Sequence, residues 1–221
     1  MKIDGSSPPW APSEEEIKAA MKCAMDLKEY YPDIRMEWNP SWPEPKGKPV
    51  QISIFVDADH ATNTADRRSI TGMKSFIDNT LYKWKSKRQT CVAESTYAAE
   101  LMALRDAAQH AIEMTHMLQS IGVPLAGPAW IFVDNNSVFL NTTMAGSVLK
   151  KKHLSIAYHI VHEGQAALYF LVFKVSSENN ISDMHTKGLT GVPYWSKVGC
   201  VMFKPNGKSY MVPDGSTNRE E

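Results

Sequence analysis

The segment from Val50 to His60 constrains the fold more than any other part of the sequence. In this segment Ile52, Ile54 and Val56 alternate with Ser, Phe and Asp, which is the period-two pattern of a half-buried β-strand. Asp57 interrupts the apolar pattern at the far end of the strand. A carboxylate at such a position costs stability unless a positive partner meets it. Asp57 therefore either begins an ordinary Asp-Ala-Asp turn or belongs to a charged site.

Strand-like and helix-like segments alternate after this first strand. Short runs of β-forming residues predict four more strands, at residues 69–79, 80–87, 129–133 and 168–175. Apolar residues spaced by threes and fours predict a long helix, at residues 91–121, and shorter helical patterns follow at 136–143, 147–166 and 181–189. The first three strands are joined by short connections and predict an antiparallel meander, whereas a strand after a long helix favours a parallel crossover. The order therefore predicts an α/β domain with a mixed five-stranded sheet.

The ends of the chain differ from this central part. Residues 1–48 predict an N-terminal helix, from residue 14 to about 31, followed by a proline-rich linker. Ser13 and Glu16 form the capping-box pattern that begins such a helix. We expect the α/β domain at residues 49–190 and a C-terminal tail, without an assigned role, at residues 191–221.

Composition narrows the class of protein. The 221 residues suffice for one ordinary domain with extensions, and 24 basic residues balance 24 acidic ones, so any basic surface must be local. The 3 cysteines are far apart and form no CxxC pair, which favours a reducing intracellular setting and excludes a cysteine zinc cluster. The longest apolar run, residues 167–173, is far too short to span a membrane.

Four acids occupy positions where chemistry is expected. Asp57 and Asp134 each close a predicted strand, and ligands of α/β sheets gather beyond the carboxyl ends of strands. Glu100 lies in the apolar stripe of the long helix, and Asp183 lies in the first turn of the last helix. Each also has an ordinary explanation: strand-end turns for Asp57 and Asp134, a boundary position for Glu100, and a favourable interaction with the helix dipole for Asp183.

The convergence of these acids favours a metal site. Carboxylates that lie close together repel one another and raise one another's pKa values. Hard divalent cations relieve this repulsion, and carboxylate oxygens are the ligands that Mg²⁺ and Mn²⁺ prefer. Two such ions, about 3.5–4 Å apart, support phosphodiester hydrolysis. We therefore expect Asp57, Glu100, Asp134 and Asp183 to bind two Mg²⁺ ions, with Mn²⁺ as a possible substitute.

Seven short motifs, in this order along residues 50–190, resemble the ribonuclease H domain of copia-type retrotransposon Pol polyproteins. They are Val56-Asp-Ala-Asp-His-Ala61, Arg67-Arg-Ser-Ile-Thr-Gly72, Trp84-Lys-Ser-Lys-Arg-Gln89, Ala99-Glu-Leu-Met-Ala-Leu104, Val133-Asp-Asn-Asn-Ser-Val138, Lys152-His-Leu-Ser-Ile-Ala-Tyr-His159 and Ser182-Asp-Met-His-Thr-Lys187. No single motif is decisive, but their order and spacing together are specific.

The resemblance implies a ribonuclease H-like fold, with helices on both faces of the sheet. It implies cleavage of the RNA strand of RNA–DNA hybrids, with Asp57, Glu100, Asp134 and Asp183 as catalytic acids. A reverse transcriptase domain would be the partner, and the site of action would be intracellular, in a cytoplasmic virus-like particle or in the nucleus. Where cellular ribonucleases H carry a histidine before the last acid, this chain has Glu178-Asn-Asn180.

Basic and polar residues near the acids predict contacts with nucleic acid. Lysines at 83, 85 and 87 would share one face of a strand, whereas Trp84 would face away from them into the core. Lys150–Lys152 form a second basic cluster. Each cluster alone could be a solvated surface, but beside a metal site both favour phosphate binding. The predicted nucleic-acid-binding residues are Lys83, Lys85, Lys87, Arg88, Asn135, Asn136, Lys150, Lys151 and Lys152.

Two other functions fit the same sequence. The chain could be a module that binds hybrids but has lost its activity, or a module that docks on a polymerase. The first would bind duplexes without cleaving them, and neither requires a divalent ion. Dependence on a metal therefore discriminates between these functions and a nuclease.

Overall fold

The computed structural model describes residues 8, 10–61, 66–149, 152–188, 191, 194–195 and 197–198. It contains a five-stranded sheet with the order β3-β2-β1-β4-β5. Strand β2 pairs antiparallel with β1 on one side and with β3 on the other. Strand β4 pairs parallel with β1 on one side and with β5 on the other. The five strands are Ile52–Asp59, Ile70–Ile77, Thr80–Arg88, Ala129–Val133 and Phe170–Lys174. The predicted mixed five-stranded sheet is confirmed.

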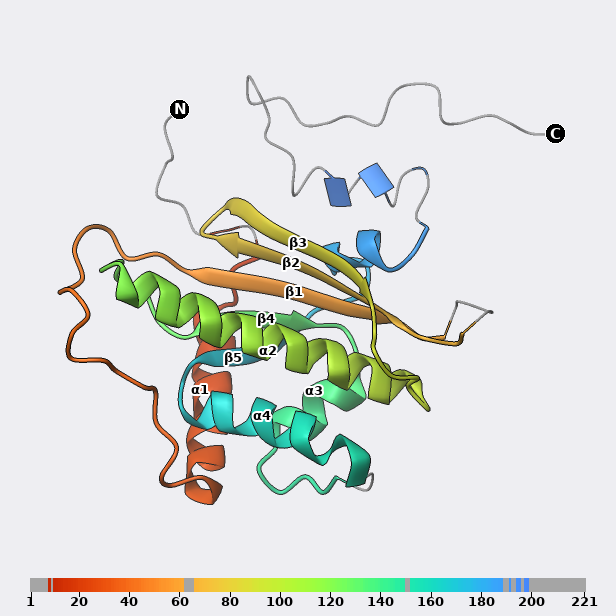
Figure 1. The fold of residues 1–221 in the computed structure, drawn as a ribbon, viewed down its shortest axis with the longest axis horizontal. Coiled ribbons are helices and arrows are strands. Elements are labelled where there is room, and N and C mark those ends of the chain that lie inside the picture. The colour runs from red at the N-terminus through yellow and green to blue at the C-terminus, as the bar shows by residue number, and fades with distance from the viewer. Residues whose placement is uncertain are drawn as a thin grey trace.

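Helices lie against this sheet and beside one another (Figure 1). Helix α2 runs along one face, mainly over β1, and α4 packs against α2. Helix α1 contacts β5, α3 and α4. The helical elements are α1 (Glu14–Tyr30), α2 (Thr96–Ser120), α3 (Asn136–Thr143), η1 (Lys152–Leu154), α4 (Ser155–Ala166) and the short 3₁₀ helix η2 (Ile181–His185). No helix among the described residues has both the length and the apolar character needed to cross a membrane.

The period-two pattern of β1 divides the core into two layers. Ile54 and its even-numbered neighbours pack under α2, which contributes a run of buried alanines and leucines. Phe55, on the opposite face, stacks on Phe132 with a centroid distance of 4.6 Å. Ala24 of α1 and Trp10 cover this second aromatic layer. The sheet is therefore buried on both faces, and the N-terminal helix supplies part of the second cover. The domain boundary at residues 48 and 49 stays a prediction.

Two of the predicted helices start earlier in the sequence than the helices of the structure. The predicted helix 91–121 begins only at Thr96, because the Ser95 side chain caps it by accepting a hydrogen bond from the Ala98 N–H. The predicted helix 147–166 was wrong at its start, because residues 147–149 are not helical and, among the described residues of this segment, helical structure begins at η1. The capping box at Ser13 and Glu16 is present as expected. Of the predicted tail, residues 199–221 lie outside the described part of the chain.

Candidate metal centre and nucleic-acid interface

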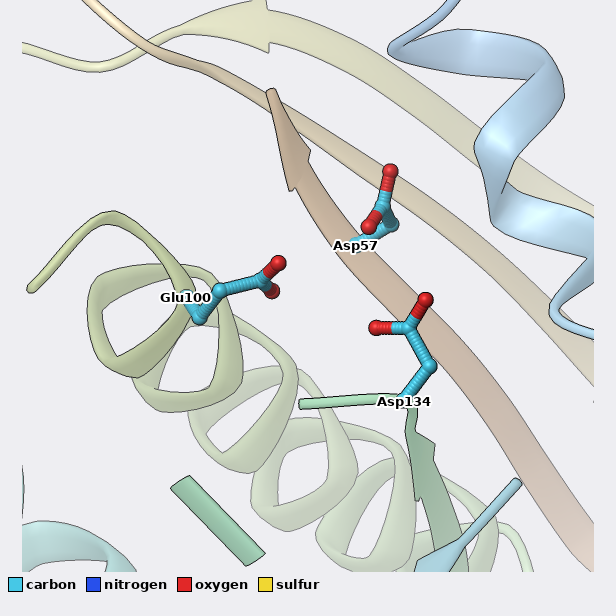
Figure 2. A group of neighbouring side chains, drawn as sticks. All are labelled: Asp57, Glu100 and Asp134. Atoms are coloured by element: carbon cyan, nitrogen blue, oxygen red, sulfur yellow. The ribbon is translucent and has the colours of Figure 1, made fainter. Parts of the chain in front are cut away.

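Three of the four predicted acids meet at one end of the sheet (Figure 2). The parallel register pairs Phe55 with Phe132; two residues later along the chain come Asp57, still on β1, and Asp134, directly after the end of β4. Glu100 reaches the same point from the second turn of α2. One carboxylate oxygen from each residue lies within 4.8 Å of the others. We call Asp57, Glu100 and Asp134 the acidic triad.

Burial makes the negative charge of the triad costly. Asp57 is 1% exposed and Glu100 is 9% exposed. Burial raises the pKa of Glu100 to about 9, with the charges of Asp57 and Asp134 adding to the effect. Burial likewise raises the pKa of Asp57 to about 6, against the opposing effects of a hydrogen bond from Thr186 and the charge of Lys187. Asp57 and Glu100 therefore resist ionisation without a cation, and with Asp134 they offer oxygen donors that fit a hard divalent ion such as Mg²⁺.

Asp183 lies beside the triad but is bound by lysines. It is 5% exposed on η2, where its Oδ1 accepts a hydrogen bond from Lys187 at 2.8 Å and its Oδ2 accepts one from Lys197 at 3.1 Å. Lys187 Nζ also lies 3.6 Å from Asp57 Oδ2. Asp183 is not a member of the group of acids whose oxygens converge within 4.8 Å. Its predicted role as a metal ligand therefore remains a proposal.

The residues that hold η2 in place were not singled out by the sequence patterns. The Thr186 hydroxyl donates a hydrogen bond to Asp57 Oδ2, and the Asn180 amide donates one to the Val56 carbonyl at 3.0 Å. Lys197 donates to the Asn180 carbonyl at 2.7 Å. Thr186 and Lys187 belong to the last of the seven motifs, and this membership was the one sequence feature that could have marked them as part of the site. Lys197 lies in the predicted tail, and nothing in its local sequence marked it.

Gly72 allows η2 to approach the sheet at this position. It pairs with Asp57 across the β1–β2 ladder, and a Cβ atom on it would lie 2.7 Å from Thr186 Cγ2 and 2.9 Å from the Ser182 carbonyl oxygen. We expect Gly72→Ala to push η2 away and to lower the free energy of unfolding by about 1–3 kcal/mol, measured by urea denaturation.

Gly127→Ala is the matched control, because a Cβ atom at Gly127 meets nothing within 4 Å. It should change the stability by less than about 0.5 kcal/mol. Equal stability of the two variants would show that η2 does not depend on close packing against Gly72.

The predicted basic strand lies at the edge of the sheet, as β3. Lys83 and Lys85 turn toward α2, where Lys83 Nζ lies 3.3 Å from His110 Nδ1 and Lys85 pairs with Asp106 at 2.8 Å. Burial, together with the charges of these two lysines, lowers the pKa of His110 to about 4. Trp84 is 64% exposed, so its predicted place in the core was wrong. As a residue of an edge strand, Trp84 can point away from α2 into solvent.

A basic depression of about 220 Å³ lies between β3 and α2. Lys87, Arg88 and Arg105 line it, together with Thr71. Arg88 pairs with Asp66 at 2.8 Å, whereas Lys87 is exposed. The depression is large enough for a phosphate group and adjoins the helix that carries Glu100.

The other predicted contacts are more dispersed. Asn135 is used as the cap of α3, since its Oδ1 accepts a hydrogen bond from the Val138 N–H at 3.1 Å, while Asn136 is exposed. Lys152 is exposed on η1. Lys150 and Lys151 lie outside the described residues. Nδ1 of His159, the last residue of the motif that begins at Lys152, lies 2.7 Å from the Tyr31 hydroxyl oxygen.

Comparisons with known proteins agree with the motif-based resemblance. No family model matches the chain. Retrovirus-related Pol polyproteins are similar to it: that of transposon RE2 of Arabidopsis thaliana is 26% identical over 166 residues, and that of transposon TNT 1-94 of Nicotiana tabacum is 29% identical over 133 residues. The matches cover 73% and 60% of this chain, but only 11% and 10% of the polyproteins. The similarity to copia-type Pol polyproteins is confirmed, and the chain spans about a tenth of their length.

Solved structures that are similar to the chain include ribonucleases H. The N-terminal ribonuclease H domain of a Mycobacterium tuberculosis protein is 15% identical, with a TM-score of 0.48, and the match covers 62% of this chain and 91% of that one. A ribonuclease H1 isolated from compost, solved with an RNA/DNA hybrid, is 13% identical, with a TM-score of 0.47 and coverage of 59% and 88%. The fold assignment rests on the strand order and directions described above.

Proposed function

We propose that this chain is a metal-dependent endoribonuclease that hydrolyses the RNA strand of RNA–DNA hybrids. The observation that carries the proposal is the acidic triad, whose three carboxylates come from β1, α2 and β4 and converge within 4.8 Å. Such convergence is costly unless a cation binds there. The similarity to Pol polyproteins supports a substrate formed during reverse transcription, and a reverse transcriptase domain as partner. An intracellular site of action, in the cytoplasm or nucleus, is part of this proposal.

The residues of the chain would divide the work as follows. Two Mg²⁺ ions, when bound, activate a water molecule and stabilise the leaving oxygen of the phosphodiester. Asp57, Glu100 and Asp134 supply oxygen ligands, and Asp183 would contribute from η2. The burial of Asp57 and Glu100 keeps bulk water away from one side of the site and strengthens electrostatic interactions there.

Basic groups on β3 and α2 would hold the hybrid against this negative site. Lys87, Arg88 and Arg105 border the depression of about 220 Å³ and are suited to a backbone phosphate. The exposed Asn136 follows the triad residue Asp134 by two positions and could reach a 2′-hydroxyl group, the group by which RNA is distinguished from DNA. Lys150, Lys151 and Lys152, the second basic cluster predicted from the sequence, would also contact the hybrid.

The proposal is tested with an end-labelled RNA–DNA hybrid, incubated with the purified chain in the presence and absence of Mg²⁺. We expect cleavage of the RNA strand alone, dependent on Mg²⁺. Asp134→Asn should reduce the rate at least about a thousandfold, because the stabilisation at stake is several kcal/mol.

Asp26→Asn, which changes an exposed carboxylate on α1, is the matched control and should retain full activity. Binding of the hybrid without cleavage, by a folded chain and in the presence of metal, would contradict the nuclease and favour a hybrid-binding module. Failure to bind the hybrid at all would favour a module that docks on a polymerase.

A further inference from the structure

The Lys187 ammonium group lies between two acids that were both expected to bind metal. It is 2.8 Å from Asp183 Oδ1 and 3.6 Å from Asp57 Oδ2, so one positive charge bridges two carboxylates from different elements. Asp57 belongs to the acidic triad, whereas Asp183 does not. A divalent cation and a lysine ammonium group both neutralise neighbouring carboxylates, so they would compete for these oxygens.

The surroundings hold Lys187 in this position. Lys187 follows Asp183 by four residues, just after the end of η2, and its backbone N–H donates a hydrogen bond to the Asp183 carbonyl at 2.9 Å. This turn of the backbone places the two side chains side by side. Lys197 holds the other oxygen of Asp183, and Thr186 donates to the same Asp57 oxygen that Lys187 approaches.

The side chain of Lys187 is nevertheless able to leave. It is 43% exposed, whereas the side chain of Lys197 is 6% exposed. A long, flexible side chain at the edge of the site can exchange its carboxylate partners for a phosphate group. Lys187 is therefore the movable cation of the site, and Lys197 is the fixed one.

We propose that the Lys187 ammonium group, paired with Asp57 and Asp183, keeps a second divalent ion from binding these carboxylates, so that the free chain binds one ion at the acidic triad. A second ion would bind when Lys187 moves away from Asp57 and Asp183, for example toward a phosphate of the bound strand. This inference rests on the proposed function, since it takes the triad to be a metal site. The position of the Lys187 side chain would therefore determine how many ions bind.

The test counts Mn²⁺ ions bound to the metal-free chain without nucleic acid. Electron paramagnetic resonance of free Mn²⁺ and titration calorimetry both give the number of ions per chain. We expect one ion for the natural sequence, two for Lys187→Met and Lys187→Gln, and one for Lys187→Arg, which keeps the charge. Circular dichroism confirms that each variant is folded.

Lys85→Met is the matched control, because Lys85 also forms a 2.8 Å ion pair but binds Asp106 away from the triad. It should bind one ion. Two ions bound by the natural sequence, or one ion bound by folded Lys187→Met and Lys187→Gln, would overturn the inference and leave the triad as a metal site. If no variant binds Mn²⁺, the metal-dependent function itself fails, and the inference falls with it.

Discussion

Replacing Lys197 by methionine should lower the free energy of unfolding by about 3–5 kcal/mol, measured by urea denaturation near neutral pH. The Lys197 side chain is buried and donates to the Ser177 carbonyl at 2.9 Å, the Asn180 carbonyl at 2.7 Å and Asp183 Oδ2 at 3.1 Å. Methionine has a similar length but no donors. The change therefore leaves buried acceptors without a partner and removes one of the two cations that balance Asp183.

The double variant Lys197→Met/Asp183→Asn separates the charge from the hydrogen bonds. It should recover part of the lost stability, because the neutral asparagine at position 183 no longer needs the positive charge that Lys197 supplied. Lys85→Met is the control for a partly exposed ion pair and should cost less than about 1 kcal/mol. A loss of similar size in Lys197→Met and Lys85→Met would mean that Lys197 does not hold η2 on the sheet.

The sheet was predictable because its strands carry strong local patterns. The alternation at Ile52, Ile54 and Val56 placed β1, and the short apolar run 129–133 placed β4 with its observed bounds. Both patterns arise from burial on a flat surface, which acts on each strand independently of its partners. The order of elements then left few possible topologies, and the resemblance selected one of them.

Other features depended on contacts that local patterns do not encode. Trp84 has the composition of a core residue, but its exposure follows from the position of β3 at the sheet edge. The start of the helix predicted at 147–166 was misjudged because α4 has no side-chain cap to mark it. In both cases tertiary packing decided the outcome.

The acids of the candidate site were predictable from local patterns, whereas the lysines that pair with Asp183 were not. Asp57 and Asp134 were found because each follows an apolar strand run, and Glu100 because a carboxylate interrupts an apolar helical stripe. Lys187 and Lys197 could not be recognised as partners of Asp183, since a lysine in a polar segment resembles any solvated lysine. Only the packing of η2 against β1 and β2 shows that their charges are used.

The stability of the metal-free chain should fall as the pH rises from about 6.5 to about 8.5, by up to about 1.4 kcal/mol per pH unit. Glu100 has a pKa of about 9 in the folded chain and an ordinary value of 4.5, so within this range the folded state holds a proton that the unfolded state has released. Rising pH therefore stabilises the unfolded state relative to the folded state. Burial lowers the pKa values of His110 and His162, so these histidines oppose the trend only below about pH 6.5.

Glu100→Gln identifies the carboxyl group responsible for this trend. Glutamine is neutral in both states, so this variant should lose most of the pH dependence and exceed the natural sequence in stability at about pH 8.5. Mg²⁺ should raise the melting temperature of the natural sequence, most strongly at high pH, because binding displaces the Glu100 proton. Glu100→Gln should lose most of that rise. Equal slopes of stability against pH in both proteins, measured in EDTA, would show that Glu100 is already ionised in the folded chain and that the triad does not hold a proton in place of a metal.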